Sequence, residues 1–233
     1  MQTTTQRLAE LVEPGLIRFR EGFALQEALF EDLVSDKRLG MSHQADARDY
    51  IICCQHLPVF TLGKSGKEEN LLVTHAELEE RGIDFIRTTR GGDITFHGPG
   101  QLVVYPILDL DFYFTDIHRY LRMLEEAVIL TLADFGITGG RIDGLTGVWV
   151  GQRKICALGV RASRWVVMHG LALNISTDLS YFALIVPCNL PDKEVTSMER
   201  ELRNTPPFLG VQAALLHHLS ALFDFGWATA NLA

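Results

Sequence analysis

The sequence predicts a single α/β domain of the α+β type, on three observations. Its 233 residues are within the size of one domain that can bury a sizeable core. Segments rich in β-branched and aromatic residues alternate with segments that carry apolar residues at helical spacing. No repeat, low-complexity tract or linker divides them. We therefore expect residues 1–15 to form a flexible N-terminal arm and residues 16–233 to form the domain.

The elements of this domain can be placed in order. The first half is expected to contain helices at 23–37 and 75–80, and a long helix that Thr115 or Asp116 caps and that ends near Phe135. A last helix is expected at 211–223. The expected strands are 16–19, 50–54, 59–63, 83–86, 147–150, 154–160 and 165–175, with a hairpin-sized connection at 151–153.

A glycine-rich stretch at 88–107 is the most distinctive part of the chain. Residues 93–97 and 101–107 look like two strands joined by the turn Gly98-Pro99-Gly100, which predicts a hairpin. Its polar residues stand beside glycines, and such a hairpin can form one wall of a narrow pocket. Alternatively, the glycines only permit tight packing at a sheet corner.

Composition excludes several classes of protein. The hydrophobic content of 47% and charge of 21% are ordinary for a globular protein, and no apolar run reaches the roughly 18 residues of a membrane helix. The N-terminus lacks the apolar core of a signal peptide, and the four cysteines show no disulfide spacing, so we expect a cytoplasmic protein without a membrane partner. A net charge of −8 argues against nucleic acid binding.

Two short motifs are judged not to be functional sites. Cys53, Cys54 and His56 are three potential metal ligands, but no second ligand pair follows at zinc spacing. Gly63-Lys64-Ser65 resembles the end of a P-loop, yet Pro58 stands where that motif needs a glycine. We therefore expect neither a metal site nor a nucleotide-binding loop at these positions.

Cys188 and Lys154 are the residues best placed for covalent chemistry. Cys188 follows a proline that stiffens the turn presenting its thiol, although a lone cysteine is more often a small buried apolar residue. A lysine in an apolar strand can lower the pKa of a nearby thiol, or its side chain can simply extend to water. His97 and His169 are rival bases, and spacing alone leaves open which base reaches Cys188.

Several stretches together resemble the lipoyl(octanoyl) transferase family. The resemblance covers about residues 16–225 and rests on six segments: 58–63 with Asn70-Leu71-Leu72, Arg90-Gly91-Gly92-Asp93-Ile94-Thr95-Phe96-His97-Gly98-Pro99-Gly100-Gln101, Gly147-Val148-Trp149-Val150, 154–161, His169-Gly170-Leu171-Ala172-Leu173-Asn174 and Pro187-Cys188. It implies the fold of the biotin and lipoate protein ligases, which is a mixed, partly antiparallel sheet flanked by helices, with residues 16–233 as the catalytic domain.

The resemblance also assigns the site residues. Cys188 matches the acyl-thioester nucleophile, and Lys154 matches the general acid and base that lowers the cysteine pKa. Asn189 departs from the glycine that usually follows the nucleophile, and Cys156 replaces a small non-thiol residue. The residues that match the acyl-substrate pocket are Arg90, Gly91, Gly92, Asp93, Ile94, Thr95, Phe96, His97, Ala157, Leu158, Gly159, Gly170, Leu171 and Ala172.

The implied reaction moves an octanoyl group from octanoyl–acyl carrier protein to a lysine ε-amino group. The acceptors are lipoyl domains of 2-oxoacid dehydrogenases and the glycine cleavage H protein, and the transfer is the first step of endogenous protein lipoylation. The resemblance implies no cofactor, metal or ATP, and we expect a monomer. Arginine side chains could form a basic patch for acidic protein partners; with Lys154, the candidates are Arg87, Arg90, Arg141, Arg153, Arg161 and Arg164.

Three alternatives remain at this point. An ATP-dependent lipoate or biotin protein ligase would share the fold without needing a cysteine. A non-catalytic module could bind carrier proteins or lipoyl domains, and its function would survive the loss of Cys188. A thioesterase would release free octanoate without any acceptor protein.

Overall fold

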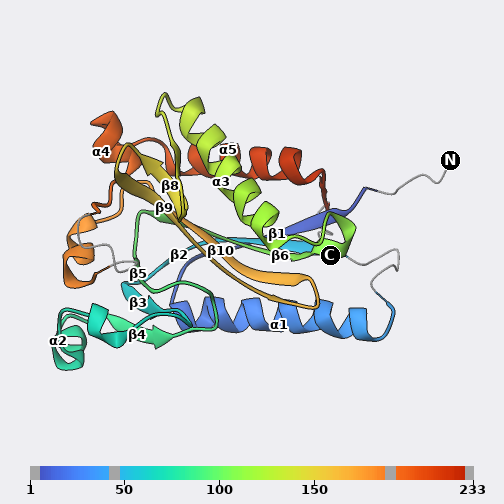
Figure 1. Cartoon of the computed structure of the whole chain (residues 1–233), viewed down its shortest axis with the longest axis horizontal. Coiled ribbons are helices and arrows are strands. Elements are labelled where there is room, and N and C mark those ends of the chain that lie inside the picture. Colours follow the sequence, from blue (N-terminus) through green and yellow to red (C-terminus); the bar gives the residue numbers. More distant parts are fainter. Residues whose placement is uncertain (1–5, 42–47, 187–192, 229–233) are drawn as a thin grey trace.

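Two β-sheets and three main helices make up the part of the chain that the computed structural model describes, residues 6–41, 48–186 and 193–228. A large sheet runs through the centre; helices α3 (Ile117–Asp134) and α5 (Phe208–Phe223) cover one face and α1 (Phe19–Arg38) covers the other (Figure 1). A small sheet lies beside one end of α1. The predicted α/β class, with a mixed sheet flanked by helices, is confirmed.

The large sheet has eight strands and is mixed. Strand β1 is parallel to both of its neighbours, β11 and β2, whereas all other pairs are antiparallel. In spatial order the strands are β11 (Gly226–Trp227), β1 (Leu8–Ile17), β2 (Asp49–His56), β6 (Gln101–Asp109), β10 (Val166–Asn174), β9 (Arg153–Ser163), β8 (Leu145–Val150) and β7 (Gly140–Ile142).

Each face of the large sheet has its own hydrophobic cluster. Phe30 and Val34 of α1 pack on Ile52 and Val103, whereas α3 and α5 contribute Leu124 and Leu215 to the cluster on the opposite face. Side chains of successive strand residues alternate between faces, so neighbouring apolar residues supply both clusters. This explains why the central strands β6 and β10 are buried along their whole length.

The small sheet has the order β4 (Asp84–Arg87), β3 (Val59–Leu62), β5 (Ile94–His97), and helix α2 (His75–Glu80) packs beside it. A separate cluster that includes Phe60, Leu78 and Phe96 forms its core. The remaining short elements are the 3-10 turns Glu68–Asn70, Leu110–Phe112 and Leu179–Leu184 and the helix α4 (Met198–Leu202).

Several local predictions are confirmed because their signals are local. Helix α2 occupies His75–Glu80 as expected, and Thr74 and Glu77 form a capping box at its start. The Asp116 side chain accepts a hydrogen bond from the Arg119 amide at 3.0 Å and so caps α3. Strands β8 and β9 pair across the tight connection that was predicted at 151–153. No helix within the described ranges is long and apolar enough to span a bilayer.

The predicted N-terminal arm is wrong for residues 8–15. These residues belong to β1, which pairs with both β11 and β2 in the large sheet. Charged residues and Pro14 obscure the strand pattern in the sequence, and the register shifts between Val12 and Gly15, where a bulge accommodates the proline. Residues 1–5 lie outside the described part of the chain.

The predicted hairpin at 93–107 is also wrong. Its two strands form, but β5 pairs with β3 in the small sheet and β6 pairs with β2 and β10 in the large sheet. The turn Gly98-Pro99-Gly100 therefore carries the chain from one sheet to the other. Gly100 has φ +80°, and a Cβ there would lie 2.7 Å from the Ser176 carbonyl oxygen, so this crossing requires glycine.

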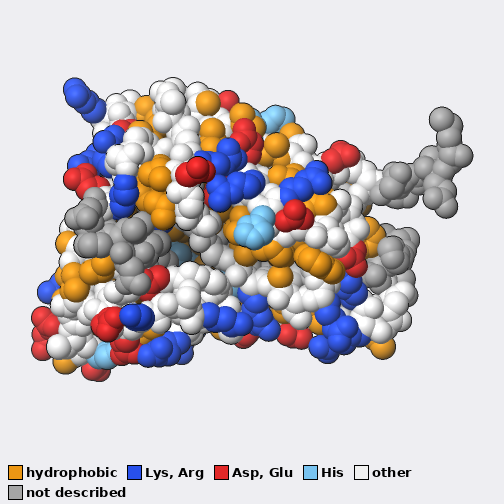
Figure 2. Space-filling view, viewed as in Figure 1, with side chains coloured by type: hydrophobic (Ala, Val, Ile, Leu, Met, Phe, Trp, Pro, Cys, Tyr) orange, Lys and Arg blue, Asp and Glu red, His pale blue; other side chains and the backbone are white. Residues whose placement is uncertain are grey.

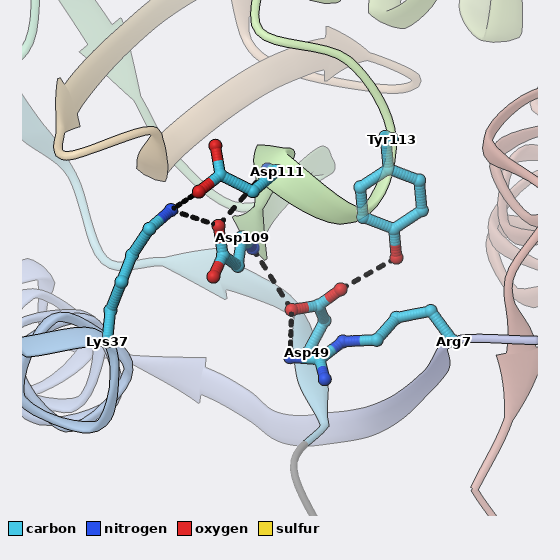
Figure 3. Close-up of polar contacts among 6 residues, drawn as sticks. All are labelled: Arg7, Lys37, Asp49, Asp109, Asp111 and Tyr113. Atoms are coloured by element: carbon cyan, nitrogen blue, oxygen red, sulfur yellow. Dashed lines mark hydrogen bonds and ion pairs between the residues drawn. The ribbon is translucent and has the colours of Figure 1, made fainter. Parts of the chain in front are cut away.

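A buried ionic network fastens β1 and β2 to the end of β6 (Figure 3). Asp49 is fully buried, lies 3.2 Å from the Arg7 guanidinium and accepts a 2.6 Å hydrogen bond from the Tyr113 hydroxyl. The Asp109 amide also donates to Asp49, and the Asp109 carboxylate is paired with Lys37 of α1 at 2.5 Å. Burial raises the pKa of Asp49, although the Arg7 charge opposes that effect.

Candidate active site

A cavity of about 590 Å³ lies between the large and small sheets. One wall comes from strands β9 and β10 of the large sheet, and the other from the loop at 90–93 and from Ile94, Thr95 and His97 of the small sheet. Gly159 follows Lys154 by five positions in β9, so about 16 Å of strand lies between these two lining residues. This size and elongated wall suit a small ligand with a long chain.

The structure brings together almost all residues predicted to form the acyl pocket. Phe96 is the exception: it is buried in the small-sheet core and stacks on Tyr181 with 4.4 Å between ring centroids. Strand alternation explains this, because Thr95 and His97 face the cavity from either side of Phe96. The predicted residues that line the cavity are Arg90, Gly91, Gly92, Asp93, Ile94, Thr95, His97, Lys154, Ala157, Leu158, Gly159, Gly170, Leu171 and Ala172.

Glycines let the loop at 90–92 lie directly on the large sheet. The Gly91 amide donates to the Val160 carbonyl oxygen at 2.9 Å, which joins the loop to β9. A Cβ on Gly159 would stand 3.0 Å from the Gly91 oxygen and 3.2 Å from the Arg90 Cδ. The glycine-rich stretch therefore forms part of the cavity wall, although not as a hairpin, and its glycines allow the close packing between the sheets that this wall requires.

Lys154 stands at one end of the cavity, where β9 begins. Its Nζ lies 4.7 Å from the centroid of the Trp149 ring, a distance at which the ring face stabilises an ammonium ion. Its backbone is held on both sides: the Lys154 amide donates to Glu194 O and the Thr196 amide donates to Lys154 O, both at 2.9 Å. The lysine is therefore fixed by main-chain pairing to residues 194–196.

Cys188 and Asn189 lie outside the described residues, but both flanks of their segment are placed. On the N-terminal side, the Val186 amide donates to the Asn70 carbonyl oxygen at 2.8 Å. On the C-terminal side, Lys193 and Glu194 line the same cavity as Lys154. The described chain thus enters and leaves this segment beside the site.

The two histidines proposed as rival bases are buried and hydrogen-bonded. His97 contacts Gln101 through Nδ1 at 2.7 Å and Thr61 through Nε2 at 3.3 Å. Burial lowers the pKa of His97 to about 3, with a further contribution from the charge of His56. Burial also lowers the pKa of His169 to about 3, aided by the charge of Arg90. Both rings are therefore neutral and weakly basic near pH 7.

These depressed pKa values predict a loss of stability in acid. An unfolded histidine titrates near pH 6.5, so below that pH the unfolded state binds protons that buried His169 does not. Stability should fall as pH drops from 6.5 towards 3, by about 2 kcal/mol for each such histidine between about pH 7.5 and about pH 5. A His169→Asn variant lacks this titration. The excess unfolding free energy of wild type over the variant should therefore be about 2 kcal/mol smaller at about pH 5 than at about pH 7.5.

Asparagine is the suitable replacement because His169 has φ +60°, and Asn tolerates this left-handed backbone. The variant also loses the stacking of His169 on Phe23, which costs stability equally at both pH values. Urea unfolding at the two pH values measures the difference. A gap that stays constant with pH would show that His169 is not buried in its neutral form.

The three other cysteines are separate from this chemistry. Cys53 and Cys54 belong to the clusters on opposite faces of the large sheet, so their thiols point apart. Burial raises the pKa of Cys54 to about 12 and also raises the pKa values of Cys53 and Cys156. All three thiols are therefore protonated and poorly nucleophilic near neutral pH.

The expected basic patch is largely neutralised. Arg153 makes a bidentate pair with Glu201 at 3.0 and 2.9 Å, Arg141 pairs with Glu125 at 2.9 Å, and Arg87 pairs with Glu68. Arg90 is buried in the cavity wall instead. On the face shown in Figure 2, basic and acidic side chains are interspersed. Among the described residues, Arg161 and Arg164 are the candidates that form no ion pair with a carboxylate, so electrostatic attraction of an acidic partner is weaker than the sequence suggested.

Fold and site together define an α/β domain with an elongated cavity that is lined in part by a lysine. The family described as the lipoyl protein ligase A/B catalytic domain matches residues 19–220. The chain is 50% identical to the octanoyltransferase of Cytophaga hutchinsonii over 96% of both chains. It is 48% identical to the octanoyltransferase of Flavobacterium johnsoniae over 92% of this chain and 96% of that protein. The chain therefore belongs to the lipoyl protein ligase A/B catalytic domain family, and within it the chain is an acyltransferase.

Solved structures confirm the fold. The T. acidophilum protein Ta0514 with bound lipoic acid superposes with a TM-score of 0.73 at 18% identity, over 96% of this chain and 88% of that chain. Lipoate-protein ligase A bound with ATP gives a TM-score of 0.68 at 18% identity, over 97% and 90%. At this level of identity the similarity concerns the fold alone.

Sequence reasoning missed several residues that line the cavity. Gln101 and Asn174 were quoted only as parts of motifs, and Trp149 only as a strand residue, yet all three face the cavity. A polar residue at the end of an otherwise apolar strand was the available signal for Gln101 and Asn174. Lys193 and Glu194 had no signal, because only their pairing with Lys154 places them at the site.

Proposed function

We propose that this acyltransferase moves an octanoyl group from octanoyl–acyl carrier protein to a lysine of a lipoyl domain, through a thioester on Cys188. The observation that carries the proposal is the elongated cavity with Lys154 at one end. The curated octanoyltransferases support it, because they match this chain over nearly their whole length. The acyl chain would lie along the wall of Ala157, Leu158 and Gly159, with its carbonyl near Lys154.

Cys188 can serve this role within the limits of the covalent chain. It follows Val186 by two residues, and two residues span at most about 7 Å. Val186 is held at Asn70, and Lys193, five residues after Cys188, lines the cavity. An ammonium ion on Lys154 would lower the pKa of the Cys188 thiol and keep it as the thiolate.

The proposed reaction has two steps. In the first, the Cys188 thiolate attacks the thioester carbonyl, a new carbon–sulfur bond forms, and the carrier leaves as a thiol with the proton from Lys154. In the second, the lysine amine of the lipoyl domain attacks the acyl-enzyme, neutral Lys154 takes the amine proton, and the Cys188 thiolate leaves. The carrier thioester is already activated, so no ATP enters the balance.

The same proposal names the partners. The acyl donor is octanoyl–acyl carrier protein, and the acceptors are lipoyl domains of 2-oxoacid dehydrogenases and the glycine cleavage H protein. We propose that the enzyme acts as a monomer in the cytoplasm. The reaction class contrasts with that of an ATP-dependent ligase, which shares the fold but activates a free acid.

The test is the intact mass of the protein after brief incubation with octanoyl–acyl carrier protein alone. We expect the mass of one octanoyl group, located by peptide mapping on Cys188 and absent from a Cys188→Ala control. Adding a lipoyl domain without ATP should then move the group to the acceptor lysine. Transfer without any adduct would indicate direct attack on the carrier thioester and overturn the role of Cys188.

Two further outcomes would support other functions. A strict requirement for ATP with free octanoate as donor would indicate a ligase. Release of octanoate from the adduct at an unchanged rate with or without acceptor would indicate a thioesterase.

A further inference from the structure

A line of buried polar side chains runs along the cavity wall and ends at the backbone that holds Lys154. It begins at Arg90, which donates to the Thr61 hydroxyl at 2.9 Å; Thr61 contacts His97 Nε2 at 3.3 Å. His97 Nδ1 contacts Gln101 Oε1 at 2.7 Å, and Gln101 Nε2 contacts Asn174 Oδ1 at 2.9 Å. The last side-chain contact is from Asn174 Nδ2 to the Thr196 carbonyl oxygen at 3.0 Å.

The chemistry of the partners fixes the direction of every hydrogen bond in this line. Gln101 also contacts the Phe96 carbonyl oxygen at 3.1 Å, and a carbonyl oxygen only accepts, so the Gln101 amide nitrogen must face it. The Thr196 carbonyl fixes the Asn174 amide nitrogen in the same way. Gln101 Oε1 must then accept from His97 Nδ1–H, which leaves His97 Nε2 to accept from the Thr61 hydroxyl.

All donors therefore point the same way, from the Arg90 guanidinium to the Thr196 carbonyl. Hydrogen bonds aligned in this manner polarise and strengthen one another in a low-dielectric interior. Asn174 and Gln101 are at most 4% exposed, so water does not compete for these bonds. In this line His97 is a neutral ring with its proton on Nδ1, which agrees with its lowered pKa.

Thr196 is also a backbone partner of Lys154. The Thr196 amide donates to Lys154 O, and the Lys154 amide donates to Glu194 O, so residues 194–196 fix where Lys154 leaves the sheet. Thr196 is therefore held at two atoms: its amide donates to Lys154, and its carbonyl oxygen accepts from Asn174 Nδ2. Losing that donor leaves a buried carbonyl unsatisfied and frees residues 194–196 to shift.

We propose that Asn174 is a positioning residue for Lys154, acting through Thr196 and held in the required orientation by Gln101. Asn174 lines the cavity two positions beyond Ala172 on β10, and its hydrogen bond to Thr196 connects it to the lysine at the end of the cavity. This inference rests on the proposed function, because it concerns the Lys154 that activates Cys188. It adds a residue that the family resemblance did not assign.

The test measures the pH dependence of Cys188 alkylation by iodoacetamide, located by peptide mapping. In wild type the Lys154 ammonium should make Cys188 reactive at low pH, and Lys154→Met should move the midpoint up towards an ordinary thiol. Asn174→Leu keeps the side-chain volume and removes the donor. We expect it to move the midpoint in the same direction as Lys154→Met and to slow acylation roughly ten- to a hundredfold, with KM little changed.

Thr131→Val is the matched control. Thr131 is fully buried in α3 and donates to the Ala127 carbonyl oxygen at 2.7 Å, so this change also removes one buried hydrogen bond at nearly constant volume. Thr131 does not line the cavity, and we expect the Cys188 titration of its variant to match wild type. The charged groups around Lys154 are the same in all variants: Lys193 and Glu194, the Arg153–Glu201 pair, and Glu125, which accepts from the Gly147 amide.

The outcomes separate this inference from the proposed function. If the midpoint of Cys188 alkylation shifts in Lys154→Met but stays at the wild-type value in Asn174→Leu, the role of Asn174 is overturned and the proposed function stands. Identical titrations in wild type and Lys154→Met overturn the pairing of Lys154 with Cys188 and this inference with it. If Asn174→Leu does not fold, Asn174→Ala replaces it with the same expected shift.

Discussion

Lys154→Met should lower the rate of Cys188 acylation by about 10²- to 10⁴-fold, which is the usual contribution of a positioned acid–base group. Methionine keeps most of the unbranched stem beside Trp149 but cannot carry a proton. The carrier thiol then leaves without a proton donor, and Cys188 loses the ammonium ion that favours its thiolate. Single-turnover acylation with octanoyl–acyl carrier protein, followed by intact mass, measures the effect.

The matched control is Lys67→Met. Lys67 is an exposed lysine paired with Glu69 at 3.1 Å and does not line the cavity, so its variant should acylate at the wild-type rate. Partial recovery of Lys154→Met by a small primary amine in the buffer would show that the missing group is the amine. A rate in Lys154→Met within tenfold of wild type would contradict the acid–base role.

Arg7→Met should reduce the free energy of unfolding by about 3–5 kcal/mol, because removing one partner leaves a buried charge without compensation. The affected carboxylate is Asp49, which is held by Arg7, Tyr113 and the Asp109 amide in the network of Figure 3. Burial already raises the pKa of Asp49, and loss of the Arg7 charge should raise it further. Chemical denaturation at neutral pH measures the loss.

The sign of the pH dependence follows from that raised pKa. In the variant, folded Asp49 holds its proton at pH values where the unfolded side chain, with a pKa near 3.8, has lost it. Because the unfolded side chain is the same in both proteins, the stability deficit of Arg7→Met should grow as pH rises above the raised pKa of Asp49 in the wild type and should be smaller below it. A deficit that does not change with pH would mean that the loss comes from packing of Arg7 on Phe112 and not from the stranded charge.

Arg48→Met provides the comparison for the ionic network. Arg48 pairs with Glu10 at 3.0 Å across the same two strands, but both side chains are more than a third exposed. Exposed pairs typically contribute less than about 1 kcal/mol. A similar loss in both variants would indicate that burial of Asp49 is not what makes its pair important.

The sequence predicted the parts of the fold that local signals determine. The helix predicted at 75–80 was confirmed, and of the two caps predicted for the long helix the structure uses Asp116. The two errors concern partners that are distant in sequence. Gly98-Pro99-Gly100 is a proper turn, but whether the strands on either side pair is decided by β3, β2 and β10, which no local pattern reveals.

The same division applies to the site. The lining of the cavity was predicted through motifs that combine glycines with polar residues, and strand alternation explains why Phe96 alone turned away. The line from Arg90 to Thr196 was out of reach, because its members come from strands of both sheets and from a loop. Polar residues separated by 22 to 73 positions become one network only through the packing of the sheets, with Gln101 and Asn174 the most distant pair.

The cavity has one wall from each sheet, and each sheet has its own hydrophobic cluster. A ligand that needs both walls binds only the assembled pair and shifts the folding equilibrium by RT ln(1 + [L]/Kd). An acyl chain tethered at one end experiences an effective concentration in the millimolar range or above, so it stabilises the assembled sheets more than the same chain free at a lower concentration. In the proposed cycle, the octanoyl group would then be both the group that is transferred and a ligand that stabilises the packing of the two sheets while it is bound.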